Sequence, residues 1–302
     1  PGLLGPETTT SRPMWRNSVR CWQNSRRFAW NLAGVPKRFY SQAQHPPITA
    51  AGIVIGDEVL NGDVKDENIG ILAKYLHGRG IPLRRVEIVS DVVDEIVEST
   101  QRLRAKHDLI FTTGGIGPTH DDCTYEALAK AYDRKVVLHE ETRDKMKALH
   151  PEKELTPERL RMATLPERCR VIYPYEKSWV PVVVLEEQCY IFPGIPKLFS
   201  RLLLSMNDAS FLPRGAPIFK RYVWTNKMES EISTPLAELQ RVYPSVQIGS
   251  YPEFDAVAHN VRLSIRSIDQ QLAAEVCERV RAVVDGFYLD QSNDSSSSFF
   301  ND

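Results

Sequence analysis

The chain has 302 residues, of which 42% are hydrophobic and 25% charged, and its formal net charge is −1. This composition is typical of a globular protein with room for one large domain, or for a medium and a small one. No apolar run approaches the roughly 20 residues of a membrane-spanning helix, so we expect no membrane partner. The five cysteines are scattered without a CxxC pair, which argues against zinc and against a disulfide framework. Haem is not expected either.

The near-zero net charge conceals an asymmetry. Residues 1–56 hold seven Lys/Arg and one acid, and this net charge of +6 leaves −7 for the rest of the chain. Because residues 57–302 carry this net negative charge, we expect them to bind nucleic acid poorly. Residues 1–44 are basic and hydroxyl-rich with interspersed aromatic residues, which is typical of a mitochondrial presequence. We therefore predict a mitochondrial matrix protein, or a cytoplasmic one if this segment is a disordered basic tail instead.

Residues 45–212 are predicted to form an α/β domain. Strand patterns near 48–56, 84–90 and 108–113 alternate with helical patterns whose apolar residues recur every three or four positions. Such alternation predicts a mostly parallel sheet between two layers of helices, a three-layer αβα fold. Ligands of these folds bind at the carboxyl ends of the strands. The acids that follow the predicted strand ends are Asp57, Glu58, Asp91, Asp121 and Asp122.

The loop after the third strand is the strongest candidate site. It contains three glycines and a proline between residues 114 and 118, and a helical pattern follows it. Glycine lets the backbone approach a ligand, and a helix N-terminus attracts phosphate. The predicted phosphate-binding residues are Thr113, Gly114, Gly115, Gly117 and Thr119. Because the adjacent acids would repel phosphate, they indicate a bound cation; the alternative is an ordinary strand-to-helix turn with Asp/Thr caps.

The remaining segments are less informative. Residues 139–168 are charged and predicted to be helical, with Pro157 and Pro166 as boundaries, and residues 182–194 suggest a β-hairpin. A Pro/Gly-containing linker near residues 213–217 precedes a predicted small α+β domain over 213–290. Its first helix is expected to begin near Ser233. Residues 291–302 are serine-rich and predicted to be disordered.

Four ordered motifs carry a family resemblance. Residues 112–132, TTGGIGPTHDDCTYEALAKAY, resemble the signature of the molybdopterin-binding fold of molybdenum-cofactor biosynthesis. Supporting motifs are GDEVLNGDVKDEN at 56–68, FPGIPKL at 192–198 and IGSYPEF at 248–254. Within this MoaB/Mog-like superfamily the chain is similar to the CinA-like branch and to the molybdopterin-binding-like module of eukaryotic FAD synthase. The resemblance covers roughly residues 48–289.

The resemblance implies roles for individual residues. Asp91 and Asp122 match active-site acids and are the expected catalytic residues, and Asn68, Gly194 and Ser250 are expected in the same pocket. A divalent metal, Mg²⁺, Mn²⁺ or Co²⁺, is the expected cofactor. Its expected ligands are Asp57, Glu58, Asp121 and Asp122. Because relatives assemble, a homo-oligomer is also expected.

Three functions remain open. The favoured one is a hydrolase, a metal-dependent nucleotide pyrophosphatase that cleaves FAD, ADP-ribose or a similar diphosphate. The alternatives are molybdopterin binding or adenylylation and a non-catalytic nucleotide-binding module, so the expected ligand is a nucleotide or a pterin. Residues 173–185, YPYEKSWVPVVVL, depart from the bacterial relatives and favour a flavin-related role. We find no resemblance to the amidase or adenylyltransferase domains of relatives, and therefore expect neither nicotinamide-nucleotide deamidation nor FAD synthesis.

Overall fold

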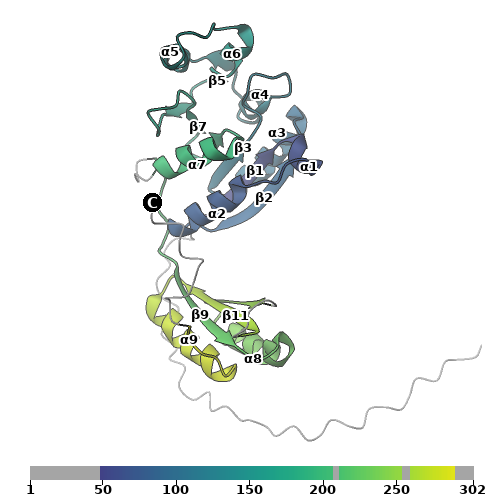
Figure 1. Cartoon of the computed structure of the whole chain (residues 1–302), viewed down its shortest axis with the longest axis vertical. Helices are drawn as coiled ribbons and strands as arrows, with labels where there is room; N and C mark the ends of the chain where they lie inside the picture. The colour runs from purple at the N-terminus through teal and green to yellow at the C-terminus, as the bar shows by residue number, and fades with distance from the viewer. Residues whose placement is uncertain (1–47, 207–210, 254–258, 290–302) are drawn as a thin grey trace, which may run out of the picture. The chain divides into compact units, whose positions relative to one another are not determined.

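The computed structural model describes residues 48–206, 211–253 and 259–289 (Figure 1). The predicted presequence in residues 1–44 and the predicted tail in residues 291–302 lie outside these ranges. Within the described ranges, no helix is both long enough and apolar enough to cross a bilayer.

A six-stranded sheet with the order β2-β1-β3-β8-β7-β6 forms the centre of the larger domain. The pairings of β2, β1, β3 and β8 are parallel, whereas β7 is antiparallel to both β8 and β6. The hairpin of β7 and β8 is the one that the sequence predicts. The strands are β1 (Ala50–Ile55), β2 (Leu83–Val89), β3 (Leu109–Thr113), β6 (Arg170–Ile172), β7 (Val182–Leu185) and β8 (Cys189–Phe192).

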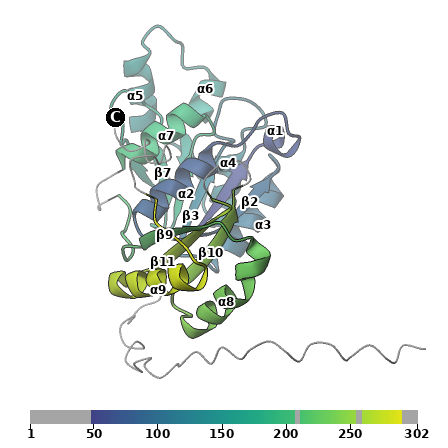
Figure 2. The ribbon, with the colours of Figure 1, turned by 60° about the horizontal axis from the view of Figure 1, so that its bottom comes forward.

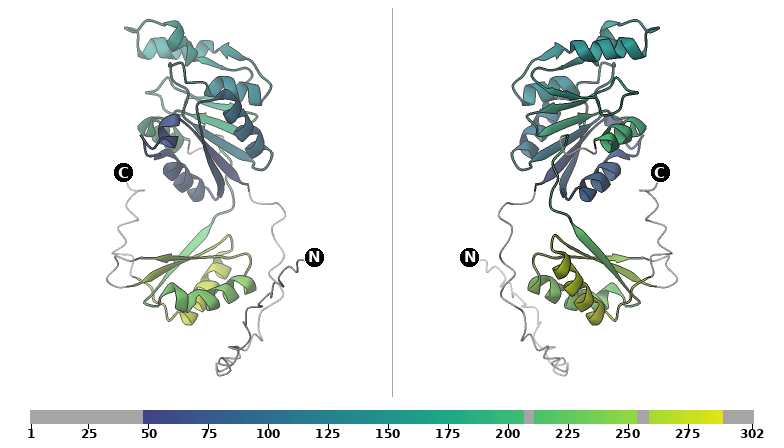
Figure 3. Two further views of the ribbon diagram at one scale, coloured as in Figure 1. Left: turned by 90° about the vertical axis from the view of Figure 1, so that its right-hand side faces the viewer. Right: turned by 90° about the vertical axis from the view of Figure 1, so that its left-hand side faces the viewer.

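Helices cover both faces of this sheet (Figure 3). Two of them share one apolar core with alternate strand residues such as Phe111, and the other two share a second core with residues such as Ile110. Neighbouring strand residues point to opposite faces, so each strand supplies both cores. The three-layer αβα prediction is confirmed. The helices of the first core are α2 (Asn68–Gly78) and α7 (Pro196–Ser205), and those of the second are α3 (Val93–Arg104) and α4 (Thr124–Ala131).

Local signals explain where these helices begin and end. Asp66 accepts a hydrogen bond from the Ile69 amide at 3.0 Å and so caps the start of α2, which ends at Gly78. In the charged segment, Thr156 caps a helix whose first residue is Pro157. The remaining elements of this domain are α1 (Asp57–Leu60), β4 (Val136–Leu138), α5 (Glu140–Leu149), α6 (Pro157–Arg161) and β5 (Thr164–Pro166).

A smaller α+β domain follows, as predicted. Its antiparallel sheet has the order β10-β11-β9, and both of its helices lie on one face of the sheet (Figure 2). Its first helix begins at Glu229 rather than near Ser233, because the Glu231 carboxylate accepts a hydrogen bond from the Met228 amide and so stabilises an earlier helix start. The elements are β9 (Phe219–Thr225), α8 (Glu229–Val242), β10 (Gln247–Pro252), β11 (Val261–Ser267) and α9 (Gln270–Val283).

Candidate functional site

The carboxyl ends of β1, β2 and β3 meet at one edge of the large sheet. The Asp57 amide, just after β1, donates to the Asp91 carboxylate, just after β2, at 2.9 Å. The loop after β3 is equally close, because a Cβ on Gly114 would lie 1.9 Å from the Ile55 carbonyl oxygen of β1. Three loops that are far apart in the sequence therefore form one site.

Two glycines give the loop after β3 its path. Gly114 has φ +107° and Gly115 has φ +63°, backbone conformations that L-residues rarely adopt. A Cβ on Gly115 would lie 2.4 Å from Thr124 Oγ1 and 3.4 Å from Asp91 Oδ1. Only glycine therefore allows the loop to pass between the start of α4 and the Asp91 carboxylate.

Asp122 holds this loop from within. Its Oδ1 accepts the Gly117 amide at 2.6 Å, and its Oδ2 accepts the Thr119 amide at 2.8 Å and the Thr119 hydroxyl at 2.5 Å. At the other end, the Thr124 hydroxyl donates to the Gly114 carbonyl at 2.8 Å. Both oxygens of Asp122 thus shape the loop, which is the cap-like role of the alternative interpretation.

The amides of the loop fall into two groups. Those of Gly117 and Thr119 donate to Asp122, and that of Gly114 donates to the Phe192 carbonyl at 3.3 Å. The amides of Gly115 and Ile116 have no hydrogen-bond partner among the described residues. Of the glycines predicted to bind phosphate, only Gly115 therefore has an amide available to an anion, and the adjacent Ile116 amide, which was not predicted, joins it.

Thr113, Asn68 and Gly194 form a buried network beside the loop. The Asn68 amide group donates to the Thr113 hydroxyl at 2.8 Å and to the Gly194 carbonyl at 2.7 Å. The Thr113 hydroxyl donates to the Pro193 carbonyl at 2.9 Å, so it fastens β3 to the segment after β8. Gly194 packs against the glycine loop, since its Cβ would lie 3.2 Å from the Gly114 Cα. These three residues therefore link the end of β3 and the segment after β8 to the start of α2, next to the glycine loop.

Asp91 has an unusual environment for a carboxylate. Burial raises its pKa above the usual range, the negative charges of Glu58, Asp57 and Asp121 raise it further, and the hydrogen bond from the Asp57 amide offsets part of the effect. Asp91 therefore holds a proton more tightly than an exposed aspartate does, which suits a general base.

The metal-ligand prediction has less geometric support. Across residues 48–206, 211–253 and 259–289, no group of three or more His, Cys, Asp or Glu side chains is arranged to hold a metal ion. Asp122 is engaged in the loop, and the Glu58 carboxylate folds back over Gly56. The Asp121 side chain is 58% exposed. The four predicted ligands thus lie around the loop without forming a preformed cage.

Arg161 is a site residue that the sequence analysis missed. It comes from α6, in the charged segment, and its guanidinium donates to the Thr119 carbonyl at 3.1 Å and pairs with Glu126 at 3.3 Å. It is therefore a cation that contacts the glycine loop directly. No motif marks it, because its contact with the loop depends on how the segment folds back.

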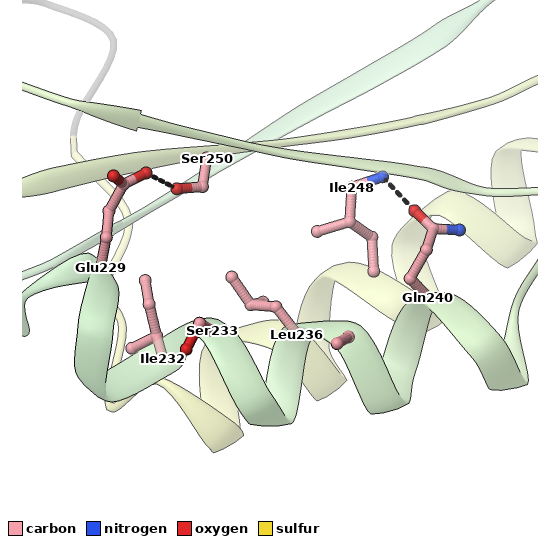
Figure 4. Close-up of a pocket in the computed structure, with 8 residues that line it drawn as sticks. Glu229, Ile232, Ser233, Leu236, Gln240, Ile248 and Ser250 are labelled. Carbon is pink, nitrogen blue, oxygen red and sulfur yellow. Dashed lines mark hydrogen bonds between the residues drawn. The ribbon is translucent and has the colours of Figure 1, made fainter. Parts of the chain in front are cut away.

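Ser250 lies on β10 of the small domain, where its hydroxyl donates to Glu229 (Figure 4). Both residues line a groove of about 420 Å³ between α8 and β10, with Ile232, Leu236 and Ile248 as its apolar wall. All residues that line this groove belong to the small domain. Among the residues that line the groove only Glu229 has an ionisable side chain, and its carboxylate accepts the Ser250 hydroxyl.

The fold and the glycine loop define a class of α/β protein that presents a strand-to-helix turn to an anionic ligand. Comparison with known proteins gives the family. Residues 51–207 match the family described as "probable molybdopterin binding domain", and residues 217–291 match "FAD synthase, middle domain". The chain therefore belongs to the molybdopterin-binding-domain family, and its CinA-like, FAD synthase-like relationship is confirmed.

Individual relatives agree. A "probable FAD synthase" of Caenorhabditis elegans is 30% identical over 79% of this chain and 50% of its own length. A "CinA-like protein" of Geobacter sulfurreducens is 31% identical over 75% of this chain and 56% of its own. A crystal structure described as CinA with unknown function, from Thermoplasma acidophilum, is 32% identical, covers 52% of this chain and 95% of its own, and has a TM-score of 0.49. The chain thus spans about half the length of the Caenorhabditis elegans and Geobacter sulfurreducens relatives.

Proposed function

We propose that this protein hydrolyses the diphosphate bond of a nucleotide such as FAD or ADP-ribose at the glycine loop. One observation carries the proposal: the amides of Gly115 and Ile116 have no partner among the described residues, and a Cβ on Gly115 would lie 3.4 Å from Asp91 Oδ1. Donors for an anion and a base for water are then side by side. The FAD synthase-like relatives support a nucleotide as the ligand.

In the proposed reaction, water attacks one phosphorus and the P–O bond of the bridge breaks. Asp91 accepts the proton of the attacking water, and its raised pKa makes it a stronger base than an ordinary aspartate. The Gly115 and Ile116 amides donate to phosphate oxygens as negative charge develops. Asp122 keeps these amides in place through the loop and does not itself take the proton.

A divalent cation is part of the proposal. Mg²⁺ is usually held by one or two carboxylates together with substrate phosphates, so the chain need not supply a full set of ligands. Asp57 and Asp121 are the proposed ligands, since their charges reach Asp91 and Asp122 is already engaged. When bound, the cation would offset the repulsion between these acids and the diphosphate.

The test is a substrate panel with the full chain. FAD and ADP-ribose are each incubated with Mg²⁺, Mn²⁺ or Co²⁺, and the released AMP is measured by chromatography. Asp91→Asn should lower kcat by 10²-fold or more, in the range typical of a lost general base. Asp94→Asn is the matched control, because its side chain is 83% exposed and pairs with Lys130 on the surface.

The wild type decides between the functions. If it hydrolyses neither substrate with any of the three metals, the proposal is wrong. A binding role then becomes the alternative, and the description of the family as molybdopterin-binding favours a pterin ligand. Calorimetric titration with molybdopterin measures that binding directly.

A further inference from the structure

Within the described part of the chain, the two helices of the small domain lie on the same face of its sheet. Val223, Leu263 and Ile265 point into the core under α8 and α9, and the residues between them point to the opposite face. Figures 2 and 3 show both helices on the same side of this sheet. The strand register therefore defines which residues lie on this second face.

Aromatic and basic side chains alternate on this face. Register pairs Trp224 with Arg262 and Arg262 with Tyr251, and four strand positions away it pairs Lys220 with Arg266. Tyr222 lies between these rows, opposite Ser264, whose own neighbour is Gly249. Because Ser264 and Gly249 have small side chains or none, the aromatic rings and the basic side chains project beyond them. We call this set the aromatic–basic face: Lys220, Tyr222, Trp224, Tyr251, Arg262 and Arg266.

The rings and cations are in contact. The Lys220 ammonium lies 4.6 Å from the centre of the Tyr222 ring, and the Arg262 guanidinium lies 5.4 Å from that ring and 5.6 Å from the Tyr251 ring. The Tyr222 and Trp224 rings are 5.7 Å apart, and Tyr251 is 41% exposed. Flat hydrophobic surface and positive charge therefore occur within one ligand's reach.

The positive charge is only partly compensated. Arg262 pairs with Glu253 at 2.8 Å, but among the described residues neither Lys220 nor Arg266 has a carboxylate partner. The buried Nε of Arg266 has no hydrogen-bond partner, and its guanidinium reaches Tyr251 Oη at 3.4 Å. A buried guanidinium donor without a partner is costly unless an acceptor arrives.

We propose that the aromatic–basic face binds a nucleotide, with the base stacked on the tyrosine and tryptophan rings and the phosphate held by Arg262, Arg266 and Lys220. Aromatic rings stack every base, and guanidinium groups are the preferred partners of phosphate. A single nucleotide fits better than a long nucleic acid, because the chain beyond residue 56 has a net charge of −7 and would repel a polyanion. This site is separate from the glycine loop and does not rest on the proposed hydrolysis.

The test measures binding of AMP and FMN to the full chain by calorimetry, with FMN fluorescence as a second readout. All variants carry Asp122→Asn in the glycine loop, so that binding there is weakened equally in each. Tyr251→Ala and Arg262→Gln should each raise the Kd of AMP about tenfold, within the range known for lost stacking and phosphate contacts. Tyr251→Phe keeps the ring and should bind as the parent does. Arg241→Gln removes the same charge from an exposed position on α8 and is the matched control.

Circular dichroism verifies that each variant is folded. The proposal is wrong if Tyr251→Ala and Arg262→Gln bind AMP as the control does. It is also wrong if adenosine binds as tightly as AMP, since the basic side chains would then not contact the phosphate. Binding of a single-stranded 12-mer RNA at least a hundredfold tighter than AMP would replace the nucleotide with RNA as the occupant and overturn the proposal.

Discussion

Asp91 shows how one residue can set both the chemistry and the stability of the site. Burial and the surrounding acids favour its neutral form, whereas its bond from the Asp57 amide favours the ionised form. Because burial and repulsion prevail, its folded-state pKa lies above the unfolded value. Between the unfolded and the folded pKa of Asp91, the folded state binds more protons than the unfolded state. The free energy of unfolding therefore decreases as the pH rises from the unfolded to the folded pKa.

This predicts opposite effects of Asp91→Asn on stability and activity. At pH 7 the free energy of unfolding should increase by a few tenths of a kcal/mol, a small gain because Asp91 is only partly buried and water screens the repulsion. Below the ordinary aspartate pKa of about 3.9 the gain should vanish. Urea unfolding at pH 7 and pH 3 measures both values. A loss of stability at pH 7 would show that the Asp57 hydrogen bond outweighs the repulsion.

Gly115 is a second residue whose identity the geometry requires. Gly115→Ala adds a Cβ beside Thr124 Oγ1 in a left-handed backbone conformation, and we expect it to cost about 1–3 kcal/mol. Gly70→Ala is the control, because Gly70 lies in α2 with nothing within 4 Å of its added Cβ, and there alanine should stabilise by up to about 1 kcal/mol. Thermal unfolding compares the two. Equal effects would mean that the loop can relax around the methyl group.

At the scale of elements, the edge strand β2 is fastened to α3 by a charged cluster. The Glu87 side chain is 10% exposed and accepts bonds from Arg102 at 2.6 Å, Ser99 at 2.6 Å and Arg85 at 2.7 Å. Burial alone would raise the pKa of Glu87, but these bonds outweigh it and lower the pKa to about 2. The strand that delivers Asp91 is thus held in register by its own side chains.

Glu87→Gln should therefore destabilise the protein in a pH-dependent way. The lowered pKa corresponds to about 3 kcal/mol of stability at pH 7, present above the unfolded pKa near 4.5 and lost as the pH falls through about 2. About two-fifths of this contribution should remain at pH 3. Urea unfolding at pH 7 and pH 3 measures this decline, and Glu98→Gln, whose carboxylate is 75% exposed and also meets Arg102, is the control. If the difference in unfolding free energy between the wild type and Glu87→Gln is the same at both pH values, the shape of the Glu87 side chain matters and its charge does not.

The elements themselves could largely be predicted from the sequence. β3, its glycine loop and α4 have clear periodic patterns, and glycine at 114 and 115 already indicates unusual backbone. Patterns cannot show which partner a side chain selects. Asp122 could be a cap, a ligand or a base by sequence, and only its three bonds to the loop distinguish these roles. Arg161 carries no periodic signal, and its position depends on the return of α6 to the loop.

At the scale of the whole molecule, the segment after α7 belongs to the core of the larger domain. Leu212 is buried in the core that contains α2 and α7, and its carbonyl accepts a bond from Arg79 at 2.7 Å. The Tyr75 hydroxyl donates to the Met206 carbonyl at 2.6 Å, and the Gly215 amide donates to the Arg79 carbonyl at 2.9 Å. The residues that begin the linker thus complete the fold that precedes it.

This packing predicts where the larger domain can be cut. A fragment of residues 46–217 should fold alone and keep the hydrolysis of the full chain, because all residues proposed for the reaction lie within it. A fragment of residues 46–210 should lose about 3 kcal/mol, since it lacks the burial of Leu212 and its bond to Arg79. Urea unfolding compares the two, and AMP release from ADP-ribose measures activity. If the longer fragment folds but is inactive while the full chain is active, the small domain contributes to the reaction. Full burial of a leucine side chain in a core contributes roughly 2 kcal/mol. Equal stability of the two fragments would therefore show that Leu212 does not contribute this amount to the larger domain.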